Sequence, residues 1–198
     1  AWEVRVFDGY WREAVERAVD PMGERLQHVG VSANGLTTAG VLMAGATAVV
    51  TGLGHLRAAL ALLVIAAIAD LFDGPVAKAS GPTTRRGAFF DSTADRVTDT
   101  LLLGGVAWHF IAEERGQLIM LPVAVMATSW LISYQRAKAE SLSFDAKGGI
   151  MERAERIIAL AVGFAFPDVL VGVLWVMLAL TLVTAGQRFA KVWRQGAP

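Results

Sequence analysis

The most informative part of the sequence is residues 68–100, which read IADLFDGPVAKASGPTTRRGAFFDSTADRVTDT. Near its beginning, Asp70 and Asp73 are three residues apart. Near its end, Asp91 and Asp95 are four residues apart. Either spacing places two side chains on one face of an α-helix. Apolar residues dominate on both sides of this stretch, so we expect two membrane helices that meet at a polar connection, each carrying one pair of aspartates.

The composition of the whole chain favours a membrane protein. Hydrophobic residues make up 55% of the 198 residues, whereas soluble proteins average about 45–50%. The formal net charge is zero, so the charge balance does not indicate a nucleic-acid partner. Cysteine is absent from the sequence, which excludes disulfides, iron–sulfur clusters and thiolate zinc sites and leaves oxygen atoms as the expected ligands of any metal.

Six segments are long and apolar enough to cross a hydrocarbon core of about 30 Å, which takes roughly 20 helical residues. They lie near residues 35–53, 57–78, 88–112, 117–138, 154–167 and 169–190. We therefore expect an all-α, polytopic membrane protein whose six transmembrane helices form one domain, residues 34–198. Residues 1–33 predict an amphipathic helix at the membrane surface, with a solvated helix that packs on the domain as an equal alternative.

Lysine and arginine are unevenly distributed among the connections. They concentrate in the amino-terminal segment, the second and fourth connections and the carboxyl-terminal tail, while the first, third and fifth connections together hold only Arg57 and Arg115. Positively charged connections stay on the cytoplasmic side of a membrane. The pattern therefore predicts a protein of the cell membrane with both termini, and the polar connection between the aspartate pairs, facing the cytoplasm.

The paired aspartates call for a positive partner. An ionised carboxylate inside a membrane costs about 2.5–3.5 kcal/mol, and several placed together also repel one another. Divalent metal ions would compensate them, and Mg²⁺ favours carboxylates together with the phosphates of a substrate. Gly74 follows Asp73 directly, and Gly87 precedes Asp91 by one turn. A residue without a Cβ allows a phosphate or nucleotide to approach the backbone closely, although close packing of helices is the alternative role.

These residues occur together as Asp70-x2-Asp73-Gly74-x2-Ala77-Lys78-x8-Gly87-x3-Asp91-x3-Asp95, a spacing that resembles the signature of the CDP-alcohol phosphotransferase family. The resemblance implies transfer of a phosphatidyl group from CDP-diacylglycerol to a small alcohol, with release of CMP and with two metal ions, Mg²⁺ or Mn²⁺. It implies that the four aspartates ligate the metals and that Asp95 is also the general base. Nucleotide contacts are implied for Asp70, Asp73, Gly74, Ala77, Lys78, Gly87 and Asp91.

One position of the signature differs from the family pattern. The family usually has arginine where this chain has Lys78. Lysine keeps the positive charge but lacks the bidentate geometry of arginine, so the contact with the nucleotide phosphates is expected to differ.

A second charged cluster follows the fourth apolar segment, at residues 133–140 (SYQRAKAE) and 148–156 (GGIMERAER). The basic residues alone could be an ordinary cytoplasmic positive signal. The cluster also resembles the corresponding region of bacterial phosphatidylinositol-phosphate synthases, which implies inositol 1-phosphate as the acceptor. The residues implied to bind its phosphate are Ser133, Arg136, Lys138 and Arg156, with Arg188 as a weaker candidate. Glycerol 3-phosphate or another polyol phosphate is the alternative acceptor.

A membrane transporter is the alternative to an enzyme. An ion-coupled transporter would also place charges in membrane helices, but no pair of interrupted hydrophobic segments recurs in two matching halves of the sequence. Arg96 and Asp99 are expected to pair with each other or to brace the metal ligands. Because homodimers are common in the family that the chain resembles, a homodimer in the lipid bilayer is expected.

Overall fold

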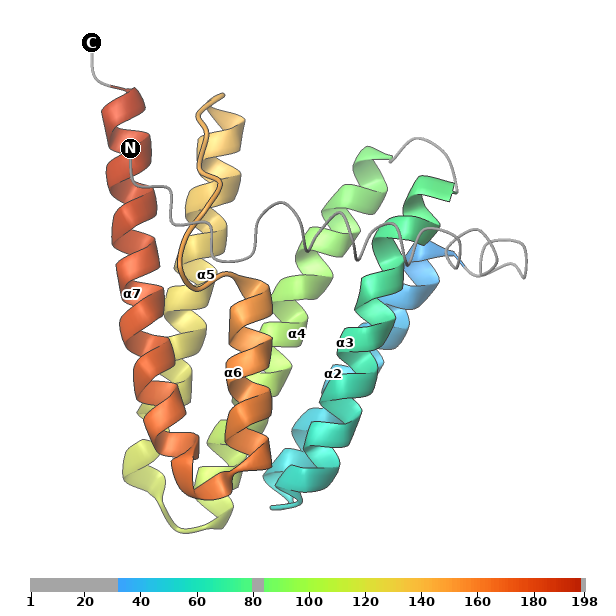
Figure 1. Ribbon diagram of the computed structural model, residues 1–198, viewed down its shortest axis with the longest axis vertical. Helices are drawn as coiled ribbons and strands as arrows, with labels where there is room; N and C mark the ends of the chain where they lie inside the picture. Colours follow the sequence, from blue (N-terminus) through green and yellow to red (C-terminus); the bar gives the residue numbers. More distant parts are fainter. Residues whose placement is uncertain (1–31, 80–83, 197–198) are drawn as a thin grey trace. The chain divides into compact units, whose positions relative to one another are not determined.

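The computed structural model describes residues 32–79 and 84–196, without the side chains of residues 71–75 and 77–79. In these ranges the chain forms helices and no strand, so the all-helical prediction is confirmed. The α-helices are α2 (Ala33–Gly52), α3 (Leu56–Ala79), α4 (Arg85–Ala112), α5 (Met120–Ser141), α6 (Arg153–Ala165) and α7 (Leu170–Gln195), and the 3₁₀ helices are η1 (Gly116–Leu118) and η2 (Pro167–Val169) (Figure 1). Each α-helix overlaps one of the predicted apolar segments.

The described helices differ in their ability to cross a membrane. Three segments are long and apolar enough to do so, namely Ala33–Gly52, Gly116–Ser141 and Pro167–Gln195. Helix α6 has 13 residues, which extend only about 20 Å at a rise of 1.5 Å per residue. The structure thus supports three of the six predicted spans. The predicted surface helix in residues 1–33 falls almost wholly outside the described residues.

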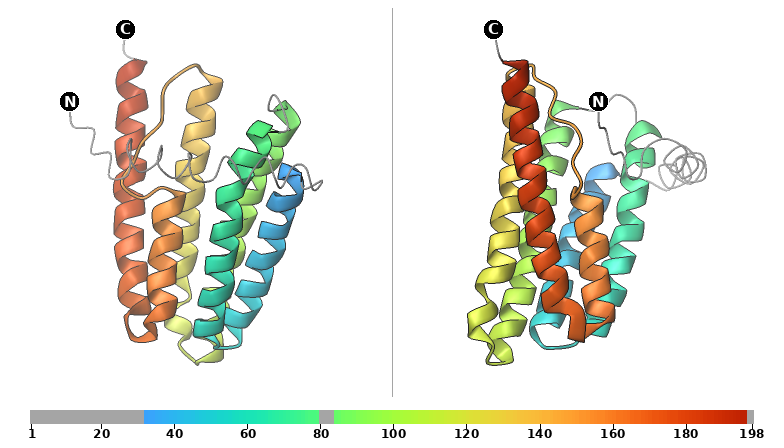
Figure 2. Two further views of the ribbon diagram at one scale, coloured as in Figure 1. Left: turned by 45° about the vertical axis from the view of Figure 1, so that its right-hand side comes forward. Right: turned by 60° about the vertical axis from the view of Figure 1, so that its left-hand side comes forward.

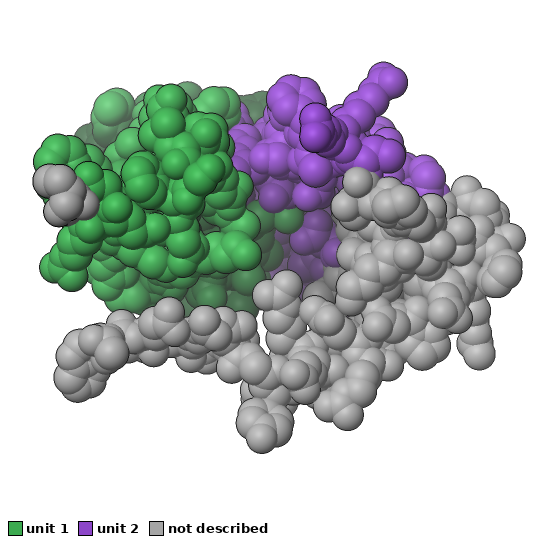
Figure 3. Space-filling view, turned by 90° about the horizontal axis from the view of Figure 1, so that it is seen from above, with its two compact units in different colours: residues 1–6, 106–198 green, residues 7–105 purple. Residues whose placement is uncertain are grey.

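The chain divides into two compact units (Figure 3). One unit, residues 7–105, contains α2, α3 and most of α4. The other comprises residues 1–6 and 106–198, and its described part contains the end of α4 with α5, α6 and α7. Each predicted cluster of functional residues falls in one unit: the aspartate pairs in the first, and the basic cluster in the second.

Small residues let the helices of the first unit approach closely. Helix α2 begins at a cap in which the hydroxyl of Ser32 accepts a hydrogen bond from the N–H of Gly35 at 3.1 Å. Along α2, Ala44 and Ala48 are buried. A Cβ added at Gly105 of α4 would lie 2.6 Å from the Cα of Ala48, so the backbones of α2 and α4 are in contact at this point. Close backbone approach through small residues is typical of membrane helices.

In the second unit, α5 and α6 both pack against α7 (Figure 2). Between α5 and α7 the hydroxyls of Thr128 and Thr181 are 2.9 Å apart, which satisfies two polar groups inside the helix pair. Helices α6 and α7 form a tight hairpin, because a Cβ at Gly163 would lie 2.7 Å from the side chain of Leu170. The fully buried Phe164 and Met177 fill the interior of this unit.

The contact of Gly105 with Ala48 predicts a strong effect of adding one methyl group. Gly105→Ala should lower the unfolding free energy by about 1–3 kcal/mol, because a close-packed interior can accommodate the new Cβ only by moving α2 and α4 apart. The midpoint of thermal unfolding in detergent measures this change.

Gly104→Ala is the matched control for this substitution. No described atom lies within 4 Å of a Cβ added at Gly104. Because alanine favours helix by about 1 kcal/mol over glycine, this variant should be as stable as the parent or more stable. Equal behaviour of the two variants would contradict the contact between α2 and α4.

Candidate active site

The two pairs of aspartates lie at corresponding heights on consecutive helices. Asp73 and Asp70 precede the end of α3 by about 9 and 14 Å, and Asp91 and Asp95 follow the beginning of α4 by about 9 and 15 Å, at 1.5 Å per residue. The connection of residues 80–84 can span at most about 20 Å, and the two helices run in opposite directions (Figure 1). The two pairs therefore lie at similar distances from the connection between α3 and α4.

The exposure of these carboxylates differs. Asp70 and Asp91 are exposed, Asp95 is half-buried and Asp99, one turn further along α4, is buried. The side chain of Asp73 lies outside the described residues, as do those of Ala77 and Lys78. Among the described side chains, no three acidic or histidine residues come together in a group that could hold a metal ion. The site of four aspartates, one of which is not described, stays a prediction.

The donor set itself fits a divalent cation of the hard type. Every predicted ligand is a carboxylate, and cysteine is absent from the sequence. Mg²⁺ and Mn²⁺ prefer oxygen ligands of this kind. Carboxylate pairs brought together in a membrane domain would repel each other in the absence of positive charge.

Arg96 contacts the turn of α4 that carries Asp91 and Asp95. Its Nη1 donates hydrogen bonds to the carbonyl oxygen of Ser92 and, at 2.7 Å, to the hydroxyl of Ser92. Because Ser92 lies between Asp91 and Asp95, this contact stiffens the segment of α4 that presents both residues. Arg96 thus contacts Ser92, while the role of Asp91 and Asp95 as metal ligands stays a prediction.

Gly87 lies at the beginning of α4, where the helix is capped. The hydroxyl of Thr84 accepts a hydrogen bond from the N–H of Gly87 at 3.0 Å. A Cβ at Gly87 would lie 3.1 Å from that hydroxyl and 3.9 Å from Oδ1 of Asn34 at the beginning of α2. The first turns of α2 and α4 therefore come together here. A residue larger than glycine would crowd this contact.

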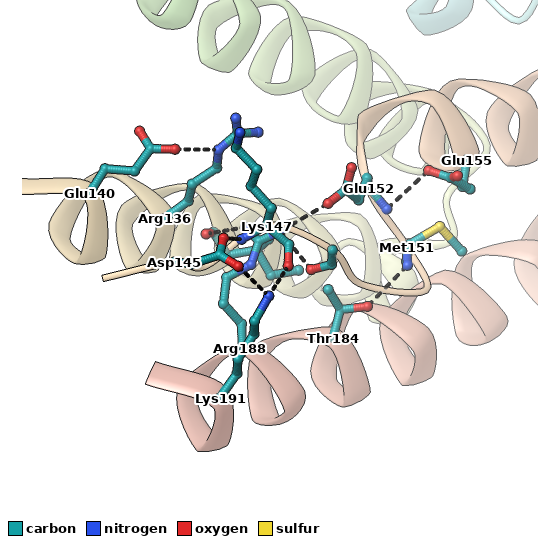
Figure 4. Close-up of polar contacts among 12 residues, drawn as sticks. Arg136, Glu140, Asp145, Lys147, Met151, Glu152, Glu155, Thr184, Arg188 and Lys191 are labelled. Atoms are coloured by element: carbon teal, nitrogen blue, oxygen red, sulfur yellow. Dashed lines mark hydrogen bonds and ion pairs between the residues drawn. The ribbon is translucent and has the colours of Figure 1, made fainter. Parts of the chain in front are cut away.

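In the second unit, Arg188 is the centre of the basic cluster (Figure 4). Its side chain is 3% exposed. Nη1 donates to the carbonyl oxygen of Ile132 in α5 at 2.9 Å, and Nη2 donates at 3.1 Å both to the carbonyl oxygen of Gly148 and to Oε1 of Glu152. The Nε of Arg188 is buried and has no hydrogen-bond partner among the described residues. One guanidinium thus joins α5, the following loop and the beginning of α6.

The other predicted acceptor residues surround Arg188 in different ways. Arg156 lies in the first turn of α6 and is 5% exposed. Arg136 is exposed, and its Nε donates to Oε1 of Glu140 at 2.9 Å. Arg136 and Arg156 both act electrostatically on Arg188, so the three guanidinium groups form one positively charged cluster. Ser133 is half-buried and lies one turn before Arg136 on α5.

Lys138 lies on a different side of α5. Because α5 continues through Ser141, Lys138 is rotated by about 140° from Ser133 around the helix. The helix therefore groups Ser133 with Arg136 and separates Lys138 from them.

The beginning of α6 is held by a capping box, which the sequence analysis did not identify. Glu152 is the N-cap, its side chain accepts from the backbone of the first turn, and the side chain of Glu155 accepts from the N–H of Glu152 at 3.1 Å. Sequence alone could have revealed this box, since Glu152 and Glu155 are three residues apart. The box fixes the first turn of α6, which carries Arg153 and Arg156.

Asp145 is a second residue that sequence reasoning missed. Its carboxylate accepts from Nζ of Lys191 at 2.9 Å and from the N–H of Lys147 at 2.9 Å. The hydrogen bond from Lys191, together with that from Lys147, holds the pKa of Asp145 below its ordinary value of 3.8. Forty-six residues separate Asp145 from Lys191, and no local pattern indicates such a contact.

Comparison with known proteins identifies the family of this chain. The model of the CDP-alcohol phosphatidyltransferase family matches residues 30–186, which include the four aspartates and the basic cluster except Arg188. The chain belongs to this family. It is therefore a phosphatidyltransferase-type enzyme. Family membership and the three membrane-length helices together make it an integral membrane protein.

The names of similar proteins indicate enzymes of inositol lipid synthesis. The chain is 30% identical to the phosphatidylinositol phosphate synthase of Mycobacterium marinum, over 92% of this chain and 82% of that protein. It is 32% identical to the archaetidylinositol phosphate synthase of Methanothermobacter thermautotrophicus, over 93% of each chain.

Solved structures of one phosphatidyltransferase from this family are also similar. The crystal structure of phosphatidylinositol phosphate synthase from Mycobacterium tuberculosis with CDP-DAG bound gives a TM-score of 0.81 at 29% identity, over 89% of this chain and 94% of that chain. The same synthase in complex with manganese and citrate gives a TM-score of 0.80 at 29% identity, over 88% of each chain. The family uses divalent metals.

The contacts of Arg188 predict a large effect of its removal on stability. Arg188→Met should lower the unfolding free energy by about 1–3 kcal/mol, because the carbonyl oxygens of Ile132 and Gly148 would lose their donor. Arg136→Met is the control, since its exposed ion pair with Glu140 contributes less than about 1 kcal/mol. Thermal unfolding of both variants in detergent measures the difference. A larger loss for Arg136→Met would contradict the central position of Arg188.

The lowered pKa of Asp145 predicts how the loop responds to acid. Its contribution to stability is present above the unfolded value of 3.8 and is lost as the pH falls through the lower, folded pKa. The amide resonance of Lys147, which binds the carboxylate, should therefore shift with a midpoint below 3.8 in NMR spectra of ¹⁵N-lysine-labelled protein. Lys191→Met should raise this midpoint. A midpoint at or above 3.8 in the unmodified protein would refute the ion pair.

Proposed function

We propose that this enzyme transfers the phosphatidyl group of CDP-diacylglycerol to inositol 1-phosphate and releases CMP. The observation that supports inositol 1-phosphate as the acceptor is the cluster of guanidinium groups in the second unit. In this cluster Arg156 and Arg188 are almost completely shielded from solvent. Guanidinium groups bind phosphate through charge-assisted hydrogen bonds, so a cluster of this kind fits an acceptor that carries a phosphate. Serine carries none.

The names of the relatives support the same acceptor. One relative forms a phosphatidyl lipid and another an archaetidyl lipid, by name, yet both are inositol phosphate synthases. Proteins with different lipid donors that share an acceptor support an acceptor site common to this part of the family. The homologous crystal structure with CDP-DAG bound supports the nucleotide donor.

The domain that carries this activity comprises residues 34–198, with all six helices α2 to α7 inserted in the membrane. The distribution of lysine and arginine supports an orientation in which both termini and the aspartates face the cytoplasmic side of the cell membrane. We include a homodimer in the proposal, by similarity to the family.

Two divalent cations, Mg²⁺ or Mn²⁺, would be held by Asp70, Asp73, Asp91 and Asp95. When bound, they would stabilise negative charge on the diphosphate of the donor and on the departing CMP. The manganese in the homologous crystal structure supports this assignment.

The protein groups then have separate tasks. Asp95 accepts the proton of the acceptor hydroxyl, whose oxygen forms a bond to the lipid-bearing phosphorus while the bond from that phosphorus to the CMP oxygen breaks. Bridged by Ser92 and Arg96, the segment of α4 that carries Asp95 is rigid enough to orient this carboxylate. The nucleotide would contact Asp70, Asp73, Gly74, Ala77, Lys78, Gly87 and Asp91.

The acceptor phosphate would be bound by Ser133, Arg136, Arg156 and Arg188, with a longer-range contribution from Lys138. Three of the five N–H groups of Arg188 already donate to protein oxygens. Its buried Nε remains available to an oxygen of the acceptor. Charge-assisted hydrogen bonds of this kind are roughly twice as strong as neutral ones.

The general-base role predicts the effect of one isosteric substitution. Asp95→Asn should lower acceptor-dependent CMP release by at least about 10²-fold, because an amide cannot accept the proton. Size-exclusion chromatography and thermal unfolding in detergent check that the variant is folded. Asp168→Asn, at the exposed turn between α6 and α7, makes the same chemical change away from both clusters and should keep full activity. An active Asp95→Asn variant would refute the assignment.

A panel of acceptors tests the substrate with the same assay. Purified protein is incubated with CDP-diacylglycerol, Mg²⁺ or Mn²⁺ and, separately, inositol 1-phosphate, inositol, glycerol 3-phosphate and serine. CMP release with inositol 1-phosphate alone supports the proposal. Release with glycerol 3-phosphate instead would change the acceptor, and metal-dependent ion flux without CMP would indicate a transporter.

A further inference from the structure

Side chains of α7 make hydrogen bonds with several backbone groups of the loop between α5 and α6, residues 142–152 (Figure 4). Gln195 bonds both the N–H and the carbonyl oxygen of Asp145, at 2.8 and 2.7 Å. Lys191 donates to the carbonyl oxygen of Lys147 at 2.9 Å, and Arg188 to that of Gly148 at 3.1 Å. At the far end, the hydroxyl of Thr184 accepts from the N–H of Met151 at 3.0 Å.

The four α7 residues form one polar stripe. Thr184, Arg188, Lys191 and Gln195 are separated by four, three and four residues, which places them on one face of the helix. Their partners in the loop follow in the reverse order along the chain. Backbone groups at the edge of a membrane need partners within the protein, because unsatisfied ones are costly. The polar stripe of α7 supplies such partners to residues 145–151 of the loop, which lie outside the helices.

Thr184 is the buried end of the stripe. It is fully buried, while Gln195 is exposed. Its hydroxyl donates to the carbonyl oxygen of Leu180 at 2.8 Å and accepts from Met151, so its orientation is set on both sides. Its methyl group packs against Gly149, where an added Cβ would lie only 2.4 Å from Cγ2 of Thr184. The loop therefore fits closely around both branches of this one side chain.

The position of Met151 determines where α6 begins. Glu152 follows it directly and is the N-cap of α6, and its carboxylate is also the partner of Arg188. Arg156 comes one turn later. A displaced Met151 would move the capping box and, with it, the guanidinium of Arg156 relative to that of Arg188. The hydroxyl of Thr184 thus acts on Arg156 indirectly, through Met151 and the capping box that begins at Glu152.

We propose that Thr184 is a positioning residue for the acceptor, which sets the distance between the two buried guanidinium groups without contacting the substrate. This inference rests on the proposed function, in which Arg156 and Arg188 bind the acceptor phosphate. It predicts that the hydroxyl of Thr184 affects the acceptor and not the lipid donor.

Thr184→Val tests the inference, because it replaces the hydroxyl by a methyl group of similar size. KM for inositol 1-phosphate should rise about tenfold, the range expected when a buried N–H loses its acceptor. The KM for CDP-diacylglycerol and kcat should each change by less than about twofold. Thr184→Ser keeps the hydroxyl and should restore the acceptor KM to nearly the value of the parent. Hydrogen–deuterium exchange of peptides from residues 142–152 should increase in Thr184→Val alone.

Thr181→Val is the matched control on the same helix. Thr181 is also fully buried, but its hydroxyl bonds Thr128 of α5 and not the loop. The substitution should lower the thermal stability and leave the KM for inositol 1-phosphate unchanged. A rise in this KM equal to that of Thr184→Val would show that any buried threonine of α7 has the effect, and would overturn the inference.

A second pair of variants covers the case in which Thr184→Val does not fold. Gly149→Ala pushes the loop away from the methyl group of Thr184, and should also raise the acceptor KM. In the Thr184→Ser background this methyl group is gone, so Gly149→Ala should raise the KM by a smaller factor. The comparison of the two backgrounds cancels the backbone strain at residue 149. Equal factors in the two backgrounds would overturn the inference.

The remaining outcomes separate this inference from the proposed function. If the parent releases CMP with inositol 1-phosphate but Thr184→Val has an unchanged acceptor KM, the positioning role is wrong and the proposed function stands. Equal rises in the KM of donor and acceptor would assign Thr184 a purely structural role. If the parent shows no acceptor-dependent release, the proposed function fails and this inference fails with it.

Discussion

The hydrogen bonds of Arg188 hold the second unit together at its polar end. A guanidinium that is nearly sealed from solvent joins the carbonyl oxygen of Ile132, the carbonyl oxygen of Gly148 and the carboxylate of Glu152. Burial makes each of these bonds strong and makes the loss of any partner costly. The end of α5, the following loop and the first turn of α6 therefore keep fixed positions on α7. The guanidinium of Arg156 belongs to the same arrangement, because it lies in that first turn.

Under the proposed function, the charged side chains of the two units would bind phosphate in different ways. The first unit presents carboxylates, which can bind a diphosphate only through divalent cations. The second unit presents guanidinium groups, which can bind a monophosphate directly. A donor that carries a diphosphate and an acceptor that carries a phosphate match this division. Under the proposed function, the donor and the acceptor phosphates would therefore be bound by side chains of opposite charge.

Rigidity near both clusters comes from short side chains that bond the backbone. Ser32 and Thr84 cap α2 and α4, Ser92 receives Arg96, and Thr184 bonds the loop before α6. The contacts of Thr84, Ser92 and Thr184 hold segments that carry charged residues a few positions away. Small residues contribute in the same way, because Gly105 and Gly149 allow backbone or side-chain contact that a Cβ would prevent. Under the proposed function, the charged residues would carry out the chemistry, while the small residues hold the segments that present them.

The sequence by itself determined the helices and the spacing of the aspartates. Apolar runs of sufficient length predict helices, and the spacing of three and four residues is a local property, so the distance of each aspartate from the end of its helix follows from helical rise alone. Only the tertiary structure decided which groups Arg188, Lys191 and Thr184 contact. Their partners lie 33 to 56 residues away in the chain, and contacts over such separations depend on how α5, α6 and α7 pack. Sequence periodicity therefore located the charged residues, and the packing of the helices decided which of them are buried and paired.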